Sequence, residues 1–221
     1  MLDVIETICR KHDITYFADW GTILGTVRHG GYVPWDDDMD ICMKREDYTR
    51  FKEAAKTELP KDFRIHDYEH QEDHWLFLSR VANSVHINFE PEHMKQFHNF
   101  PYIAGIDIFV LDYLYKDEQQ EKQRCEEVKH IIAVADSIIA GEIAQPVKEA
   151  NLIQLEEKYH KTFNRKLDNR HMGIELYRLA EEQMARVPKE ESDRMAQIFP
   201  WGLLGNRGQD REYYEKFVRF R

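Results

Sequence analysis

The chain has few of the features that mark secreted or membrane-spanning proteins. Its 221 residues include only 3 cysteines, Cys9, Cys42 and Cys125, an odd and widely spaced set that suits neither a disulfide framework nor a zinc ribbon. No apolar run approaches the roughly 20 residues that a membrane-spanning helix needs, and no charged-then-apolar leader opens the sequence. We therefore expect a cytoplasmic protein without a transmembrane segment.

Positive charge is also scarce. Lys and Arg total 31 against 41 Asp and Glu, for a formal net charge of −10, which disfavours nucleic acid as a partner because such binding needs a basic surface. One basic run, "KYHKTFNRKLDNRH" (158–171), stands out. We interpret it as a solvated helix face, with peripheral contact to an anionic glycan or a membrane surface as the alternative. With 10 Gly, 7 Pro and 42% hydrophobic residues, the chain is expected to be ordered and globular.

Hydrophobic periodicity divides the chain into two parts. The first mixes helices with short strands, and the second, from about Lys116 to Arg186, is helical, with a stripe that includes Val128, Ile131 and Ala135. The pattern predicts helices over 3–12, 21–29 and 45–59, strands over 14–18, 39–43, 63–68, 75–81, 84–89 and 105–114, and a loop over 90–102. We therefore predict an α+β fold with two parts, a mixed part at 1–115 and a mostly helical part at 116–221.

Acidic residues are concentrated in "GYVPWDDDMD" (31–40), directly before an apolar segment. In a strand, residues two apart point to the same face, so Asp38 and Asp40 are expected to point together while Met39 enters the core. Asp107 lies between Ile106 and Ile108 on another predicted strand, where an acid is costly to bury without a positive partner. Three converging carboxylates suit Mg²⁺, which uses a few carboxylates together with substrate phosphates. We predict one or two Mg²⁺ ions at Asp38, Asp40 and Asp107.

These acids have other interpretations. A run of aspartates is often a solvated turn, and the roles of Asp36 and Asp37 stay open. A calcium-binding loop is excluded because Ile41 occupies the position that requires glycine. For Asp107, the structural alternative is an ion pair with a cation at the edge of the core such as Arg80.

A phosphate-binding turn is predicted upstream of the acids. Gly21 and Thr22 open a helix after a strand, where free N–H groups and the helix dipole favour an anion. Glycine permits close approach, the Thr22 hydroxyl is a donor, and Arg28 offers a planar guanidinium. The segment is neither a P-loop nor a dinucleotide fingerprint, since no lysine follows the glycines. Arg80 is interpreted either as an ion-paired residue at the edge of the core or as a contact for a substrate phosphate.

The stretch "YFADWGTILGTVRHGGYVPWDDDMDICMKREDY" (16–48) resembles the LicD family, which is related to fukutin-type enzymes and includes phosphocholine transferases. The matching positions are Gly21, Thr22, Leu24, Gly25, Arg28, His29, Pro34, Trp35, Asp36, Asp37, Asp38 and Asp40. The later "GIDIFVLD", with Asp107 and Asp112, also resembles a family segment. The resemblance implies a nucleotidyltransferase-type fold, in which a small mixed sheet with flanking helices carries the Gly-Thr turn and three acids. On this basis we expect residues 1–115 to be the catalytic core and the helical part, 116–221, to complete a substrate cleft.

The resemblance also implies a reaction. A CDP-activated alcohol, with CDP-choline favoured, would donate its alcohol-phosphate to a sugar hydroxyl of a surface or cell-wall glycan or glycolipid and release CMP. Asp107 is predicted to be the general base beside the metal, and Mn²⁺ is an expected substitute for Mg²⁺. Two alternatives stay open: nucleotidyl transfer from an NTP with release of pyrophosphate, and a non-catalytic module that binds nucleotide or glycan.

Overall fold

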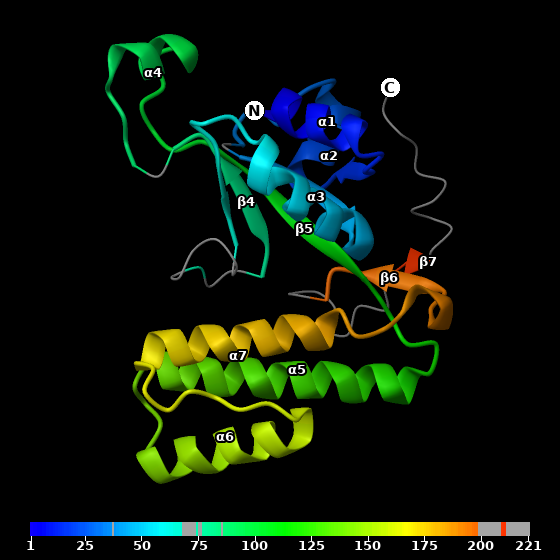
Figure 1. Ribbon diagram of the computed structural model, residues 1–221. Helices are drawn as coiled ribbons and strands as arrows, with labels where there is room; N and C mark the ends of the chain where they lie inside the picture. The colour runs from blue at the N-terminus through cyan, green and yellow to red at the C-terminus, as the bar shows by residue number, and fades with distance from the viewer. Residues whose placement is uncertain (37, 68–73, 75–76, 85, 199–208, 211–221) are drawn as a thin grey trace. The chain divides into compact units, whose positions relative to one another are not determined.

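The fold is described from a computed structural model that covers residues 1–36, 38–67, 74, 77–84 and 86–198 and the backbone of 209–210. Within these residues the chain forms two compact units (Figure 1). The first comprises Met1–Asp67 and Leu78–Leu111, and the second comprises the described residues from Asp112 onward together with His74 and Phe77. The predicted use of 116–221 in a substrate cleft stays a prediction.

The first unit is built on a five-stranded mixed sheet in the order β1-β2-β5-β4-β3. The strands are β1 (Tyr16–Ala18), β2 (Met39–Lys44), β3 (Arg64–His66), β4 (Ser79–Ala82) and β5 (Gly105–Tyr113). The central pair, β2 and β5, is parallel, whereas β1 pairs antiparallel with β2 and β4 pairs antiparallel with both β5 and β3. The predicted mixed sheet with flanking helices is confirmed.

Side-chain alternation gives this sheet two different faces. On β2 and β5 the apolar Ile41, Met43, Ile106 and Ile108 belong to one buried cluster, against which Met39 also packs, as predicted. The same cluster takes apolar side chains from α1 (Leu2–Lys11) and α3 (Arg45–Glu58). Asp40 and Asp107 alternate with these residues and therefore point to the opposite face.

Two predictions in this unit were wrong. The segment 84–89 is not a strand in its described residues, because local polar bonds shape it: the Ser84 hydroxyl accepts from the His86 N–H, and the Asn88 side chain accepts from the Glu90 N–H. The predicted loop 90–102 contains the short helix α4 (Pro91–Gln96). The predicted strand at 75–81 begins at Ser79 within the described residues, and Trp75 and Leu76 lie outside them.

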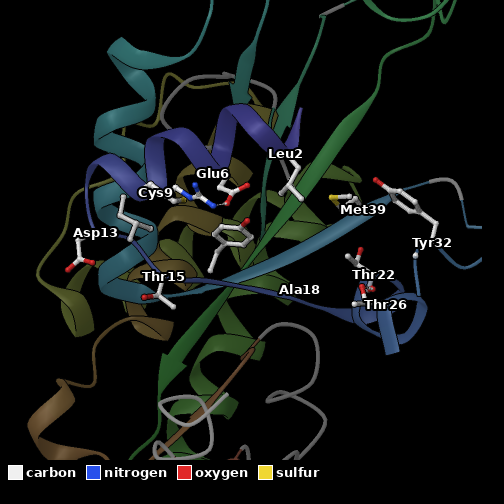
Figure 2. A pocket seen from close by; sticks show the side chains of 14 residues that line it. Leu2, Glu6, Cys9, Asp13, Thr15, Ala18, Thr22, Thr26, Tyr32 and Met39 are labelled. Atoms are coloured by element: carbon white, nitrogen blue, oxygen red, sulfur yellow. Dashed lines mark hydrogen bonds and ion pairs between the residues drawn. The ribbon is translucent and has the colours of Figure 1, made fainter. Parts of the chain in front are cut away.

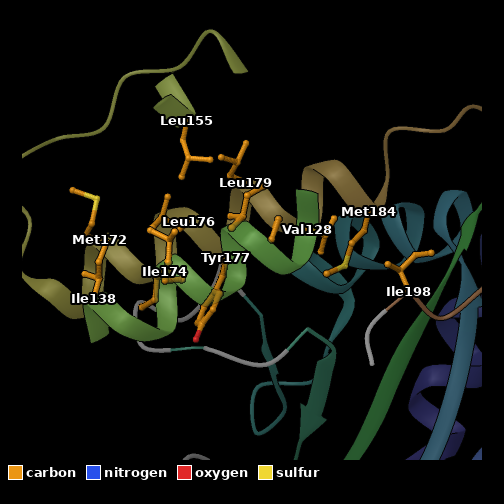
Figure 3. Packing of buried hydrophobic residues seen from close by; sticks show 14 of the residues in the cluster. Val128, Ile138, Leu155, Met172, Ile174, Leu176, Tyr177, Leu179, Met184 and Ile198 are labelled. Atoms are coloured by element: carbon orange, nitrogen blue, oxygen red, sulfur yellow. The ribbon is translucent and has the colours of Figure 1, made fainter. Parts of the chain in front are cut away.

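The second unit is mainly helical, as predicted. It contains α5 (Glu118–Ile139), α6 (Gln145–Tyr159) and α7 (Asn169–Met184), whose apolar faces meet in one buried cluster (Figure 3). In the predicted stripe of α5, Val128, Ile131 and Ala135 are fully buried. A Cβ on Gly173 of α7 would overlap the Ile139 side chain of α5, so glycine is needed where these two helices pack closely.

Polar groups also stabilise the second unit. Arg124 is fully buried and donates to the carbonyls of Tyr113 (3.1 Å) and Met184 (2.8 Å) and to Glu121. The last two residues of β5, Asp112 and Tyr113, pair with β6 (Arg194–Ala196), which in turn pairs with β7 (Gln209–Asp210). Neither strand was predicted. A single 3₁₀ turn, η1 (Lys189–Glu191), precedes β6.

The basic run 158–171 is not a helix face. Most of it is the connection between α6 and α7, and several of its cations form ion pairs within the unit: Lys158 with Glu127, Lys161 with Glu182, and Arg165 with Glu149 and Glu156. These pairs give the cations a structural role. Contact with a membrane surface stays a prediction.

All three cysteines are buried and free of disulfides. Among the helices of the described residues, none combines the length and apolar character needed to cross a bilayer.

Candidate metal and phosphate site

Three acids converge where β2 begins. Asp38 immediately precedes the strand and is exposed, whereas Asp40, its second residue, is buried. The parallel register sets Asp40 beside Asp107 of β5. Asp38, Asp40 and Asp107 each contribute a carboxylate oxygen, and these three oxygens lie within 4.8 Å of one another. The structure therefore brings together the three acids that the sequence predicts as metal ligands.

The donor set fits a hard divalent cation. With Mg–O distances of about 2.0–2.1 Å, opposite ligands of one ion are about 4 Å apart, which is comparable to the spacing of these oxygens. Burial, followed by the charges of Asp38 and Asp107, raises the pKa of Asp40 to about 7. The protein thus holds negative charge where it is poorly solvated, and a bound cation would relieve that repulsion.

Asp107 has a second partner across the sheet. The antiparallel register sets Arg80 of β4 opposite Asp107, and both its Nε and its Nη2 donate to the carboxylate, the latter at 2.7 Å. This bond to Asp107 raises the pKa of Arg80. Gly105 makes room for the arginine, because a Cβ there would lie 2.6 Å from Arg80 Cδ. The ion-paired interpretation of Arg80 is therefore observed, and its side chain keeps 42% of its surface exposed.

The predicted Gly-Thr turn lies next to the acids. The helix α2 (Trp20–His29) starts one residue earlier than predicted and is capped by Asp19, whose carboxylate accepts the Trp20 N–H at 2.9 Å. Trp20 has a positive φ of 44°, which is unusual for a bulky residue and turns the chain sharply from strand to helix. The Thr22 hydroxyl accepts the Asp40 N–H at 2.8 Å. The first turn of α2 is thus bonded directly to the strand that carries the acids.

Gly21 lies against the side chain of another acid. A Cβ there would overlap Oδ2 of Asp36, so the missing side chain makes room for that carboxylate. Asp36 had no assigned role in the sequence analysis, and it adds to the negative charge that acts on Asp40. Asp37, the other unassigned acid, lies outside the described residues. The approach of a substrate phosphate to Gly21 stays a prediction.

Arg28 is farther away along the same helix. It is exposed in the last turn of α2, seven residues after Gly21, and a rise of 1.5 Å per residue separates the two by about 10 Å along the helix axis. Only its extended side chain could reach a ligand at the other end of the helix.

Asp19 is a site residue that the sequence analysis missed. Its charge acts on Asp40, and it forms a side-chain hydrogen bond with Cys42. This bond, the Asp19 charge and above all burial raise the pKa of the Cys42 thiol. The sequence does indicate a structural role for Asp19, because an Asp directly before a helix is a preferred N-cap residue.

A large cavity lies beside this site, and Asp38, Asp40 and Asp107 are not among the residues that line it. About 870 Å³ in volume, it is lined mainly by α1, β1 and the start of α2, with Tyr32 and Met39 (Figure 2). Met39 points into it, so the cavity lies on the face of β2 opposite to Asp40. Thr22 is part of its wall. The spacing of the three carboxylate oxygens suits a cation, and the described residues that line the cavity include no comparable group of acids.

The described site therefore consists of acids on two adjacent strands of a mixed sheet, beside a helix that is capped by Asp19. The family model described as "LicD/FKTN/FKRP, nucleotidyltransferase domain" matches residues 13–133, more than half of the chain. The chain belongs to this family, and the predicted relationship is confirmed.

Individual relatives match over short stretches. The lipopolysaccharide cholinephosphotransferase LicD of Haemophilus influenzae is 43% identical over 51 residues, which are 23% of this chain and 19% of that protein. Uncharacterized proteins of Rickettsia typhi and Rickettsia prowazekii are 46% and 51% identical over 43 and 37 residues, 20% and 17% of this chain and 14% of each relative. The matched stretch thus spans less than a fifth of each of these relatives.

Proposed function

We propose that the protein is a Mg²⁺-dependent transferase that moves an alcohol-phosphate from a CDP-activated donor to a sugar hydroxyl of a surface or cell-wall glycan. Phosphocholine is the favoured group, because the Haemophilus influenzae relative is named a cholinephosphotransferase. The observation that carries the proposal is the convergence of Asp38, Asp40 and Asp107 in a chain of this family. Its expected location is the cytoplasm.

The three carboxylates would hold the cation, Mg²⁺ or Mn²⁺ in its place. When bound, the ion neutralises charge on the donor phosphates and on the departing CMP. Gly21, Thr22 and the N-terminus of α2 would bind the donor phosphates through backbone N–H groups and a hydroxyl. Arg80, and Arg28 from the far end of α2, would add positive charge.

The transfer is an in-line displacement at phosphorus. The acceptor hydroxyl oxygen forms a bond to the phosphorus that carries the alcohol, and the bond from this phosphorus to the bridging oxygen breaks and releases CMP. Asp107 would take the proton of the attacking hydroxyl. Arg80 donates to both oxygens of the same carboxylate, so this role requires that the acceptor hydroxyl meets a lone pair of Asp107 that the arginine does not use.

Product analysis tests the proposal. CDP-choline, CDP-ribitol and CDP-glycerol are each incubated with the protein, Mg²⁺ and a panel of sugar acceptors, and CMP is quantified by chromatography. We expect release of CMP that EDTA abolishes and that an Asp38→Asn variant lacks.

Two results would replace the proposal. Release of pyrophosphate from an NTP, without CMP from any CDP-alcohol, would establish nucleotidyl transfer, an activity consistent with the family's description. Binding of these compounds without any turnover would indicate a non-catalytic module, for which the three converging acids would have no evident use.

A further inference from the structure

Both backbone polar groups of Asp40 are bonded at the junction of β1 and α2. Its carbonyl accepts the Asp19 N–H at 3.0 Å, and its N–H donates to the Thr22 hydroxyl at 2.8 Å. The Asp40 backbone is therefore fixed by the residues that connect strand to helix.

The register of β1 and β2 explains why the Asp40 N–H is bonded to a side chain. Ala18 pairs with Ile41, so Asp19 is the next residue opposite Asp40. In an antiparallel hydrogen-bonded pair the two residues exchange both N–H···O bonds. Here the Asp19 carbonyl accepts the first bond of α2, from the Ile23 N–H at 3.1 Å, and the Asp40 N–H donates to the Thr22 hydroxyl. The Thr22 hydroxyl thus serves as the acceptor at this position of the strand pair.

We propose that Thr22 is a positioning residue for the metal ligand Asp40. Thr22 accepts the Asp40 N–H at the last position of the β1–β2 pair, before the chain turns into α2. This bond fixes the position of the Asp40 carboxylate relative to Asp38 and Asp107. This inference rests on the proposed function only in taking the three acids to bind a cation. This role of Thr22 is compatible with a contact to a donor phosphate, because the hydroxyl that accepts the Asp40 N–H still has its own proton to donate.

The inference makes a quantitative prediction about cation affinity. Loss of groups that orient metal ligands typically weakens metal binding by about 10–100-fold. Thr22→Val keeps the shape of the side chain and removes the acceptor, so Mn²⁺ should bind about 10–100-fold more weakly. Thr22→Ser keeps the hydroxyl and should stay within about threefold of the wild type.

Thr26→Val is the matched control. Thr26 lies one turn farther along α2, and its hydroxyl donates to the Thr22 carbonyl at 2.8 Å, whereas the Asp40 N–H donates to the Thr22 hydroxyl. We expect this variant to bind Mn²⁺ as the wild type does.

The experiment is a calorimetric titration of each full-length variant with Mn²⁺ alone, together with amide hydrogen exchange at Asp40. The Asp40 amide should lose protection in Thr22→Val and keep it in Thr22→Ser and Thr26→Val. If Thr22→Val does not fold, Thr22→Ala is measured against the same criteria.

The outcomes separate the two proposals. A folded Thr22→Val protein that is less heat-stable but binds Mn²⁺ with wild-type affinity would show a merely structural threonine and overturn the inference alone. A wild-type protein that binds no Mn²⁺ would overturn the proposed cation site, and the inference with it.

Discussion

At the scale of single residues, the site is defined by unfavourable charge. Asp40 is buried beside Asp38 and Asp107, and its pKa of about 7 shows that the folded protein resists ionising it. Below about pH 4 the carboxyl is protonated in both folded and unfolded chains. As the pH rises toward 7, the unfolded chain gives up this proton more readily, so the cation-free protein loses stability.

Asp40→Asn removes this pH-dependent cost. The variant should lack Mg²⁺-dependent turnover, and without metal it should melt at a higher temperature than the wild type. The gain should be larger at pH 8 than at pH 5, as measured by thermal unfolding in EDTA at both values. Turnover close to wild type would contradict the assignment of Asp40 as a ligand.

Asp107→Asn tests whether Asp107 takes part in the reaction or only forms a structural ion pair with Arg80. If Asp107 is both ligand and base, the variant should fold, bind the CDP-alcohol and release CMP at least about 100-fold more slowly. The bond to Arg80 should add only about 1 kcal/mol of stability, because the arginine is substantially exposed. A double-mutant cycle with Arg80→Gln, followed by chemical denaturation, measures that coupling. A large loss of melting temperature with turnover intact would remove Asp107 from the mechanism.

At the scale of elements, α2 depends on close backbone packing. A Cβ on Gly25 would lie 2.5 Å from the Gly31 carbonyl oxygen and 2.7 Å from the Val33 nitrogen, and backbone atoms cannot move aside cheaply. Gly25→Ala should therefore cost about 1–3 kcal/mol of stability.

Gly31→Ala provides the matched control for Gly25→Ala. A Cβ on Gly31 meets nothing within 4 Å, so the change should stay within about 0.5 kcal/mol. Urea denaturation of both variants provides the measurement. Equal effects would mean that the turn after α2 does not pack on Gly25 in solution.

The sequence predicted the elements with strong periodicity. Apolar spacing, together with residues that start or stop a helix, predicted α1, α2, α3, α5, β2 and β5. The meeting of Asp40 with Asp107 follows from two acids on buried strands. The short elements were missed because tertiary context decides them: β6 (Arg194–Ala196) is a strand because it pairs with the end of β5 and with β7. The helix α4 (Pro91–Gln96) carried a usable signal, a proline in its first turn.

Contacts that depend on an exact pairing partner were beyond prediction. Arg80 could be assigned to either of two roles until the register set it opposite Asp107. Thr22 appeared to be only a phosphate donor, because its bond to Asp40 depends on how the chain leaves β1.

At the scale of the whole molecule, the two units should respond differently to the cation. All three acids belong to the first unit, whereas the buried cluster of α5, α6 and α7 belongs to the second. Hydrogen exchange followed by mass spectrometry should show that Mn²⁺ protects peptides containing β2 and β5 much more than peptides of α5 to α7. Equal protection of both units would contradict a cation site confined to the first. The Asp38→Asn variant is the control and should show no Mn²⁺-dependent protection.

The parallel pairing of β2 and β5 has a consequence for the order of folding. Asp107 follows Asp40 by 67 positions, and a parallel pair cannot be closed by a tight hairpin. During synthesis, the chain therefore contains Asp38 and Asp40 long before β5, which carries Asp107, has been made. Such an intermediate has no assembled site for a cation. Since the ion recognises only the finished sheet, it should slow unfolding while leaving the folding rate nearly unchanged.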